Sequence, residues 1–450
     1  MNRYLQAIIV LTTLCGGRLE AQTIGTAPRL VVSITIDQLR TDYIEQFSAM
    51  YGEGGLRRLI EQGRVYEAAG YPFSPVDRAS AVATIVTGTC PQYNNITCSQ
   101  WLDRSTLRPV SCTDDADYGI SPQRIATSTI GDELKVATSG IALVHSVAAD
   151  KETAVIASGH AADGAYWLNE SAGRWATSSY YGTSAQNMVR AYNSTRKGLT
   201  GNDAVADFAE ACIADLGMGI DATTDMLFVG LSARCDDADG LQGDIELAYL
   251  RLDKTLERLL TSIEQRIGES QVLFVVTSTG YTDERPVDYE RYRIPTGTFY
   301  INRTANLLNM YLGALFGHGT YVEACYKNQI YINRKLLEQR HIAFDDVMAR
   351  SKELLSQASG VTAVTLSPYN TAVSGDLVVE VAPGWQLVNE DTGEQYVSRA
   401  AFVPFPIILY GAEIEPGRVT TEATTDRIAP TIAKAIRIRA PNACVVAPLQ

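Results

Sequence analysis

The chain has 450 residues, of which 46% are hydrophobic and 20% are charged. That apolar share can fill a large core, and the length suits one large α/β domain with insertions or a chain of two lobes. The formal net charge of −13 repels phosphate backbones and anionic lipid headgroups. A nucleic-acid partner is therefore not expected.

The N-terminal segment 1–21 has the pattern of a secretory signal peptide. A basic residue, Arg3, precedes the apolar run 7–11, and a small residue directly precedes Gln22. Such a segment is removed on export and is too short to anchor the chain in a bilayer. We expect residues 22–450 to be periplasmic or secreted. No membrane span is expected, because no later stretch is apolar over the length that a bilayer requires.

The eight cysteines suggest different roles. Cys15 lies in the signal segment, where the preceding Leu14 is too large for a good lipoprotein cleavage site, so a lipid anchor is the less favoured alternative. Cys98 and Cys112 lie close together in a polar, turn-rich segment and are the most favoured disulfide pair, with two free thiols as the alternative. Cys212 lies on an apolar helical stripe and is expected to be a buried free thiol.

Four short runs are almost entirely apolar, at 30–36, 226–231, 272–276 and 405–410. Continuous runs of this kind predict strands that are buried on both faces, as in a parallel sheet covered by helices. An apolar stripe between the second and third runs ends at Gly268 and predicts a helix, and hence a βαβ unit. We expect an α/β fold with a central, mostly parallel sheet and helices on both faces. In such sheets ligands bind beyond the carboxyl ends of the strands.

Sequence blocks around these runs carry a family resemblance. The blocks are LVVSITIDQLR at 30–40, TIVTGT at 84–89, WLDR at 101–104, STIGDEL at 128–134, SGHAADGAYW at 158–167, YGAEIEPGR at 410–418 and TDRIAPTI at 425–432. Together they resemble the alkaline phosphatase superfamily, in its type I phosphodiesterase and nucleotide pyrophosphatase branch. They are most similar to secreted bacterial phosphate-irrepressible alkaline phosphatases. This resemblance implies one alkaline-phosphatase-like domain over 22–450, with cap-like insertions near 90–200 and 282–400.

Active members of this branch use two zinc ions and a Thr or Ser nucleophile. The resemblance places the nucleophile at Arg78 and the metal ligands at Asp37, Cys235, Asp239, Thr279, Gly280 and Pro404 or a neighbour of Pro404. Only Asp37 is retained, with Cys235 and Asp239 as imperfect substitutes, whereas zinc needs three or four converging ligands. Arg78 cannot attack phosphorus, because a guanidinium is always protonated and offers no lone pair. We therefore expect no catalytic residue and no metal cofactor.

The positions that clamp phosphate in the branch are also altered. The resemblance places them at Ser99, Asp150 and Glu152, so that two cations have become two anions. A phosphoryl dianion would be repelled where an active relative attracts it. This reversal favours a protein without phosphatase activity.

Two functions follow from these changes. The first is a catalytically inactive secreted or periplasmic protein that acts as a binding or scaffold component of an envelope assembly, with another envelope protein as its partner. The alternative is a residual metal-dependent phosphatase or phosphodiesterase with rearranged ligands from Asp37, Asp239, Cys235 and Asp236 or Asp237. The aromatic segments 167–181 and 289–300 could anchor a partner or pack around the empty site.

Three further patterns have structural explanations that we favour. Ser80 and Thr84 lie near the lost nucleophile, but without metal ligands nothing would activate either hydroxyl. The acidic run 235–240 partly imitates a calcium loop, and a solvated loop is favoured because the first ligand has become Cys. His160 matches no metal-ligand position, so we expect it to make structural hydrogen bonds.

The altered site leads to a prediction for Asp37. A buried carboxylate without its metal is costly unless it is paired or protonated. The position of Arg78 allows its guanidinium to reach back to Asp37, and the fork of the guanidinium suits a carboxylate. We predict an Asp37–Arg78 ion pair. The alternative is that Arg78 points to solvent or pairs with Asp77 or Glu152.

Overall fold

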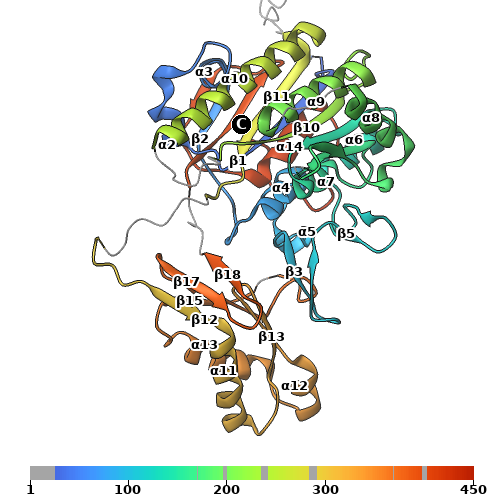
Figure 1. The fold of residues 1–450 in the computed structure, drawn as a ribbon. Coiled ribbons are helices and arrows are strands. Elements are labelled where there is room, and N and C mark those ends of the chain that lie inside the picture. The colour runs from blue at the N-terminus through green and yellow to red at the C-terminus, as the bar shows by residue number, and fades with distance from the viewer. Residues whose placement is uncertain are drawn as a thin grey trace, which may run out of the picture.

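The computed structural model describes residues 26–169, 171–195, 200–234, 242–282, 291–367, 369–397 and 403–450. They form a large α/β lobe around a central sheet and a smaller lobe that lies below it in the view of Figure 1. The signal peptide predicted at 1–21, including Cys15, lies outside the described residues. So do the predicted metal-site positions Cys235 and Asp239.

Ten strands form the central sheet in the order β20-β2-β19-β11-β1-β10-β7-β8-β9, with β21 also paired to β2. Their bounds are β1 (Leu30–Asp37), β2 (Arg64–Gly70), β7 (Val144–Ala148), β8 (Gly164–Asn169), β9 (Arg174–Ala176), β10 (Asp225–Ser232), β11 (Val272–Ser278), β19 (Phe405–Gly411), β20 (Gly417–Val419) and β21 (Ala423–Thr424). β1 is parallel to both β10 and β11, and the parallel pairing continues through β7 to β8. β19 is antiparallel to both of its neighbours, and β9 is antiparallel to β8. The predicted α/β class with a mostly parallel sheet is confirmed.

The apolar runs form the middle of this sheet. Every residue of β1 and β11 is buried, which explains why these strands are continuously apolar and do not alternate. The register sets Asp37 opposite Ser232 on β10 and Ile36 opposite Ser278 on β11. The three strands therefore end at one edge of the sheet, where their following residues meet.

Helices cover both faces of the sheet. One core contains side chains of α2, α3, α8, α9 and α10, the other contains those of α4, α6 and α14, and α7 contributes to both. The bounds are α2 (Thr41–Gln46), α3 (Leu56–Gln62), α4 (Arg78–Thr87), α6 (Ile130–Ala137), α7 (Lys151–Ser158), α8 (Gly182–Thr195), α9 (Gly201–Leu216), α10 (Gln242–Ile267) and α14 (Ile428–Ile436). No helix within the described ranges is long and apolar enough to cross a bilayer.

Only part of the first predicted insertion, 90–200, lies outside the central sheet. Its first third forms a short helix and two hairpins, namely α5 (Pro91–Asn94), β3 (Gln100–Asp103) with β4 (Arg108–Ser111), and β5 (Asp114–Asp115) with β6 (Gly119–Ile120). The later part supplies β7, β8 and β9 to the sheet. The insertion is therefore shorter than predicted. The sequence did not reveal β7, because His145 and Ser146 interrupt its apolar run.

The second predicted insertion, 282–400, contains the smaller lobe. One sheet has the order β12-β17-β18 and the other β13-β14-β16-β15. The bounds are β12 (Gly297–Tyr300), α11 (Ile301–Phe316), β13 (Val322–Tyr326), β14 (Gln329–Ile332), α12 (Arg334–Arg340), α13 (Phe344–Leu355), β15 (Val361–Leu366), β16 (Leu377–Val381), β17 (Trp385–Asn389) and β18 (Glu394–Val397). Its apolar side chains form a core of their own. The lobe is therefore a separate packing unit inserted between β11 and β19.

A buried carboxylate, Asp376, ties the smaller lobe to the β3–β4 hairpin. Arg104 of the β3–β4 turn donates from Nη2 to Asp376 Oδ2 at 2.8 Å. Arg334 donates from Nη2 to Oδ1 at 2.6 Å, and the Ile332 amide donates to Oδ2 at 2.7 Å. Leu102 of β3 also packs against tyrosines of β13 and β14. The hairpin reaches from the large lobe to the smaller lobe (Figure 1) and carries both polar and apolar contacts between them.

The predicted disulfide between Cys98 and Cys112 is wrong, because both cysteines are free thiols. The Cys112 amide donates to the Ser99 carbonyl oxygen at 2.9 Å, so the hairpin register sets Cys112 opposite Ser99. Cys98 precedes β3, and its thiol donates to the Gln100 carbonyl oxygen at 2.9 Å. Burial raises the pKa of both thiols. Cys212 is a buried free thiol on α9, as predicted.

Candidate functional site

Asp37 lies at the carboxyl end of β1, where the neighbouring strands also end. The residue is buried, with 6% of its surface exposed. Arg78 donates from Nη2 to Asp37 Oδ2 at 2.7 Å, and Thr279 donates from Oγ1 to Asp37 Oδ1 at 2.8 Å. Both carboxylate oxygens are therefore bound by donors that belong to the chain itself.

Arg78 is the first residue of α4 and lies between two carboxylates. Besides its bond to Asp37, its Nη1 lies 3.9 Å from Asp150 Oδ1. Burial lowers the pKa of Arg78, but the negative charges of Asp150 and Asp37 more than offset this effect and raise it. The guanidinium is therefore a permanent cation at this site. The predicted Asp37–Arg78 ion pair is confirmed, in place of pairing with Asp77 or Glu152.

Of the two acidic residues predicted at clamp positions, only Asp150 faces Arg78. Asp150 is the N-cap of α7 and accepts a hydrogen bond from the Thr153 amide at 2.8 Å. Burial raises the pKa of Asp150, although the charge of Arg78 opposes this. Glu152 pairs instead with Lys151, whose Nζ lies 3.5 Å from Glu152 Oε1.

Ser99, the third predicted clamp position, is bound to Asp77. Asp77 Oδ2 accepts from the Ser99 amide at 2.7 Å and from Ser99 Oγ at 2.8 Å, while Oδ1 accepts from the Ser80 amide at 3.0 Å. Asp77 therefore caps α4 and fills the N-terminal end of that helix. This capping role of Asp77 was not predicted from the sequence. Asp77 followed three residues later by Ser80, just before an apolar run, is a helix-start pattern that could have revealed it.

The space beside Gly280 is filled by aromatic rings. Gly280 has φ +70°, and a Cβ there would lie 2.6 Å from Cε2 of Tyr71 and 2.7 Å from Cε1 of Phe405. Tyr71 is fixed by donating from its hydroxyl to the Ser278 carbonyl oxygen at 2.8 Å. At Pro404, the carbonyl oxygen accepts from the first amide of α2 at 2.8 Å. The metal-ligand positions that the resemblance assigns to Gly280 and Pro404 thus belong to packed, irregular backbone.

We expect Gly280→Ala to lower the free energy of unfolding by about 2–4 kcal/mol. A left-handed backbone costs a non-glycine residue about 1 kcal/mol or more, and overpacking against Tyr71 and Phe405 adds about 1–3 kcal/mol. Gly119 has a similar φ of +73° but no atom within 4 Å of an added Cβ. Urea unfolding should therefore show a smaller loss for Gly119→Ala. Equal losses in the two variants would contradict the tight packing at Gly280.

Ser80 and Thr84 both use their hydroxyls inside α4. Both residues are fully buried in α4. Thr84 Oγ1 donates to the Ser80 carbonyl oxygen at 2.9 Å, and Ser80 Oγ donates to the Asp77 carbonyl oxygen at 3.0 Å. These hydroxyls serve the helix backbone and its cap.

A pair of zinc ions does not fit this site as far as the chain is described. Asp37 is held by Arg78 and Thr279, and Gly280 carries no side chain that could act as a ligand. Within the described ranges, no group of three or more His, Cys, Asp or Glu side chains is arranged to hold a metal. The acidic run 235–240 lies outside those ranges, together with its Cys235 and Asp239.

His160 has the structural role that the sequence predicts. Its Nδ1 lies 3.0 Å from Asp132 Oδ2, and its Nε2 lies 3.1 Å from the Ile125 carbonyl oxygen. Both partners are acceptors, so this geometry suits the imidazolium form, in which each ring nitrogen carries a proton. The hydrogen bond to Asp132 raises the pKa of His160, although burial opposes this. Burial alone would raise the pKa of Asp132. Hydrogen bonds from His160 and from the Thr129 amide outweigh burial, so the pKa of Asp132 is lowered.

We expect this pair to make the stability depend on pH. Because the pKa of His160 is raised on folding, its contribution to the free energy of unfolding is complete below its unfolded-state pKa of about 6.5. That contribution is lost as the pH rises through the pKa of the folded state. The contribution of Asp132 is complete above about pH 3.9 and is lost as the pH falls. His160→Ala should lower the free energy of unfolding by about 1.5–3 kcal/mol near pH 6. The midpoint urea concentration of the wild type should fall between pH 6 and pH 9, and this fall should be smaller in the variant. The exposed His341 gives the control, since His341→Ala should keep the wild-type pH dependence.

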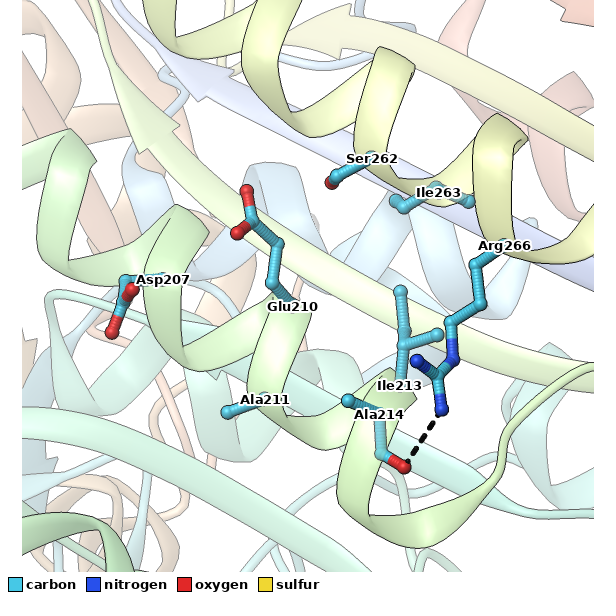
Figure 2. Close-up of a pocket in the computed structure, with 8 residues that line it drawn as sticks. All are labelled: Asp207, Glu210, Ala211, Ile213, Ala214, Ser262, Ile263 and Arg266. Atoms are coloured by element: carbon cyan, nitrogen blue, oxygen red, sulfur yellow. Dashed lines mark hydrogen bonds between the residues drawn. The ribbon is translucent and has the colours of Figure 1, made fainter. Parts of the chain in front are cut away.

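A groove of about 340 Å³ lies between α9 and α10, on one of the two helix-covered faces of the sheet. Figure 2 shows Arg266 reaching from α10 toward α9, where its Nη2 donates to the Ala214 carbonyl oxygen at 3.1 Å. The lining also includes Asp207 and Glu210 of α9. None of the predicted site residues lines this groove.

The parallel central sheet and the polar cluster beyond the end of β1 define an α/β fold of the alkaline phosphatase type. The family model described as type I phosphodiesterase / nucleotide pyrophosphatase matches residues 31–401. The chain belongs to this family. The family predicted from the sequence blocks is thus confirmed.

Similar proteins cover nearly the whole chain. A protein of Myroides odoratus named calcium-transporting ATPase is 26% identical over 94% of this chain and 94% of its own length. The alkaline phosphatase PafA of Elizabethkingia meningoseptica is 24% identical over 100% of this chain and 98% of its own. The crystal structure of wild-type PafA superposes with a TM-score of 0.82 at 22% identity, covering 94% of this chain and 98% of that chain. This structural likeness establishes the shared fold.

Proposed function

We propose that this chain is a catalytically inactive member of its family that is exported to the periplasm or secreted. It serves as a binding or scaffold component of an assembly at the cell envelope, and its partner is another envelope protein. The observation that carries the proposal is the state of Asp37, whose carboxylate is held by Arg78 and Thr279. A guanidinium at the nucleophile position has no lone pair with which to attack phosphorus.

The electrostatics of the site support the loss of phosphatase activity. Asp150 faces Arg78 at 3.9 Å, and Asp77 fills the N-terminal end of α4. A phosphoryl dianion at this place would meet several carboxylates around the single cation of Arg78, in place of two metal ions and a cationic clamp. The rings of Tyr71 and Phe405 leave no space for a side chain at Gly280.

Of the two aromatic segments, 289–300 supports a partner surface better than 167–181. Trp175 and Tyr181 of segment 167–181 are buried, with 5% and 7% exposed, so they pack inside the large lobe. Tyr292 and Ile294 are exposed by 61% and 45% and precede the smaller lobe. We place the partner contact at these two residues, because exposed aromatic side chains commonly anchor protein interfaces.

The second candidate is a residual metal-dependent phosphatase or phosphodiesterase. It is favoured by the similarity to the alkaline phosphatase PafA over the whole chain. Its metal would need Asp37, released from Arg78, together with Cys235 and Asp239. The two candidates make opposite predictions for metal content and turnover.

Elemental analysis and a hydrolysis assay on the same preparation distinguish the candidates. After dialysis against zinc, we expect less than one zinc ion per chain. We also expect no hydrolysis of chromogenic phosphomonoesters or diesters above background. Two zinc ions per chain, or turnover that Asp37→Ala abolishes and Asp42→Ala spares, would establish the second candidate. Asp42 is the matched control, because its exposed carboxylate pairs with Arg40 on the surface.

A further inference from the structure

The strand β15 forms one edge of the larger sheet in the smaller lobe. Among the described strands it pairs only with β16, in antiparallel orientation. An edge strand presents backbone N–H and C=O groups that have no partner strand, and proteins commonly protect such an edge with charged side chains, proline or a bulge. Without this protection, another strand can add to the edge.

Charged side chains do not protect β15. No Asp, Glu, Lys or Arg occurs in the segment 354–375, although charged residues make up 20% of the chain. β15 itself also contains no proline, and most of its residues are β-branched, which favours strand pairing. The strand β13 at the opposite edge carries Glu323 and has a bulge between Val322 and Ala324. The two edges of this sheet therefore differ, and β15 is the one that is open to a further strand.

The hydrogen bonds of β16 show which backbone groups of β15 face outward. The Val379 amide of β16 donates to a carbonyl oxygen on the β14 side of the sheet. Because successive residues of a strand direct their backbone groups to opposite sides, the groups of Val378 face β15. Val378 is paired with Thr365, so Thr365 bonds inward. Its neighbours Val364 and Leu366 therefore direct their N–H and C=O groups away from the sheet.

The same end of β15 is open to solvent. Thr365 is exposed, and Leu366 is 52% exposed. The Val364 side chain, in contrast, lies in the core of the smaller lobe, where α13 packs on the strand. An added strand would thus cover Leu366 and leave this core unchanged.

We infer that β15 is a dimerisation edge, on which a second copy of this chain pairs antiparallel through the same strand. In this pairing a two-fold axis passes between the two Thr365 residues, so that Leu366 of each copy lies opposite Val364 of the other. Each of these opposite pairs exchanges both of its N–H···O bonds. The two threonines form a cross-strand pair on the exposed face.

Charge and symmetry favour a second copy over a different partner. Each copy carries a net charge of −13, so two copies repel each other over most of their surfaces. The uncharged segment 354–375 adds nothing to this repulsion at the contact. The outward groups of β15 are also complementary to themselves about a two-fold axis, so the assembly closes at two copies. The dimer does not depend on whether the chain hydrolyses phosphate esters, so it goes beyond the proposed function.

Sedimentation equilibrium of the purified protein tests the dimer. We expect a monomer–dimer equilibrium whose dissociation constant rises at least about tenfold in Leu366→Pro, because proline removes an outward N–H group. Proline is tolerated on an edge strand at such a position, so the fold should be kept. Leu366→Lys replaces this variant if circular dichroism shows that it does not fold, since an edge lysine also opposes strand addition. Leu315→Thr removes a leucine of α11 that is 49% exposed and should leave the dissociation constant unchanged.

A cysteine at the two-fold axis tests the register. Opposite residues that do not exchange hydrogen bonds have Cα atoms about 4.5 Å apart, which a disulfide can bridge. With oxidised glutathione, Thr365→Cys should therefore form a covalent dimer on a non-reducing gel. Thr362→Cys is the matched control, because Thr362 is exposed on the same strand but would lie about 20 Å from its copy across the axis. The wild type controls for the native thiols.

The dimerisation edge is wrong if the wild type stays monomeric at its highest soluble concentration, which would leave β15 to a different partner. It is also wrong if the dissociation constant is the same in the wild type and in the folded edge variant. Cross-linking of Thr365→Cys no faster than that of the wild type or of Thr362→Cys would exclude the pairing about Thr365.

Discussion

Arg78→Ala is expected to lower the free energy of unfolding by about 3–5 kcal/mol, because it leaves the Asp37 carboxylate without its cation. The Asp37 side chain is 9% exposed, so water cannot replace the guanidinium fully. Thr279 would still donate to Oδ1, but a hydroxyl does not neutralise a charge. Urea unfolding of the two proteins measures the difference.

A double variant separates the ion pair from other effects of Arg78. Asp37→Asn in the Arg78→Ala background should recover part of the lost stability, because it removes the uncompensated charge. Arg57→Ala is the control for losing an arginine from an exposed pair, since its partner Glu53 is 85% exposed. That control should cost no more than about 1 kcal/mol. If Arg57→Ala and Arg78→Ala lower the free energy of unfolding equally, the Asp37–Arg78 pair stabilises the fold no more than an exposed surface pair.

Asp376→Ala is expected to cost at least about 3–5 kcal/mol and to loosen the smaller lobe first. The Asp376 side chain is 0% exposed and binds the guanidinium groups of Arg104 and Arg334. Its loss leaves both guanidinium groups without their anion and the Ile332 amide without its acceptor. Hydrogen exchange should rise first in β14, β16 and the β3–β4 hairpin, and thermal unfolding should begin at a lower temperature.

Two variants calibrate this result. Asp376→Asn keeps the size and one acceptor oxygen, so its loss should be smaller than that of Asp376→Ala. Arg303→Ala breaks a surface pair with Glu390 in the same lobe, where the two side chains are 65% and 35% exposed. It should cost about 1 kcal/mol or less. Uniform hydrogen exchange across both lobes in Asp376→Ala would argue against a local role of this carboxylate.

The sequence predicted the middle of the large lobe better than its margins. β1, β10 and β11 are buried on both faces, so their apolar runs are continuous and easy to recognise. β7 contains His145 and Ser146, and β2 reads Arg-Val-Tyr-Glu-Ala-Ala-Gly, so neither strand stands out in composition. Their place in the sheet depends on partners far away in the chain. A pattern in one short segment does not contain that information.

At the candidate site, the sequence predicted the one contact that depends on only two residues, the Asp37–Arg78 ion pair. A buried carboxylate at Asp37 and an arginine at the start of a neighbouring helix were enough to infer the ion pair. The approach of Asp150 to Arg78 and the capture of Ser99 by Asp77 were not inferred. Both depend on how α4, α7 and the hairpin segment pack, and that arrangement is set by the whole core.

The strand β2 bears on how the chain is made. Its neighbours in the sheet are β19, β20 and β21, all of which follow the smaller lobe in the sequence. During synthesis, β2 emerges early, but its hydrogen-bonding partners emerge only after residue 404. The backbone N–H and C=O groups of β2 therefore stay without their strand partners through most of translation. An unpaired strand can pair wrongly, so β2 depends on delayed folding or on a chaperone. A chain that stops before β19 would present this open edge permanently and become a substrate for proteolytic quality control.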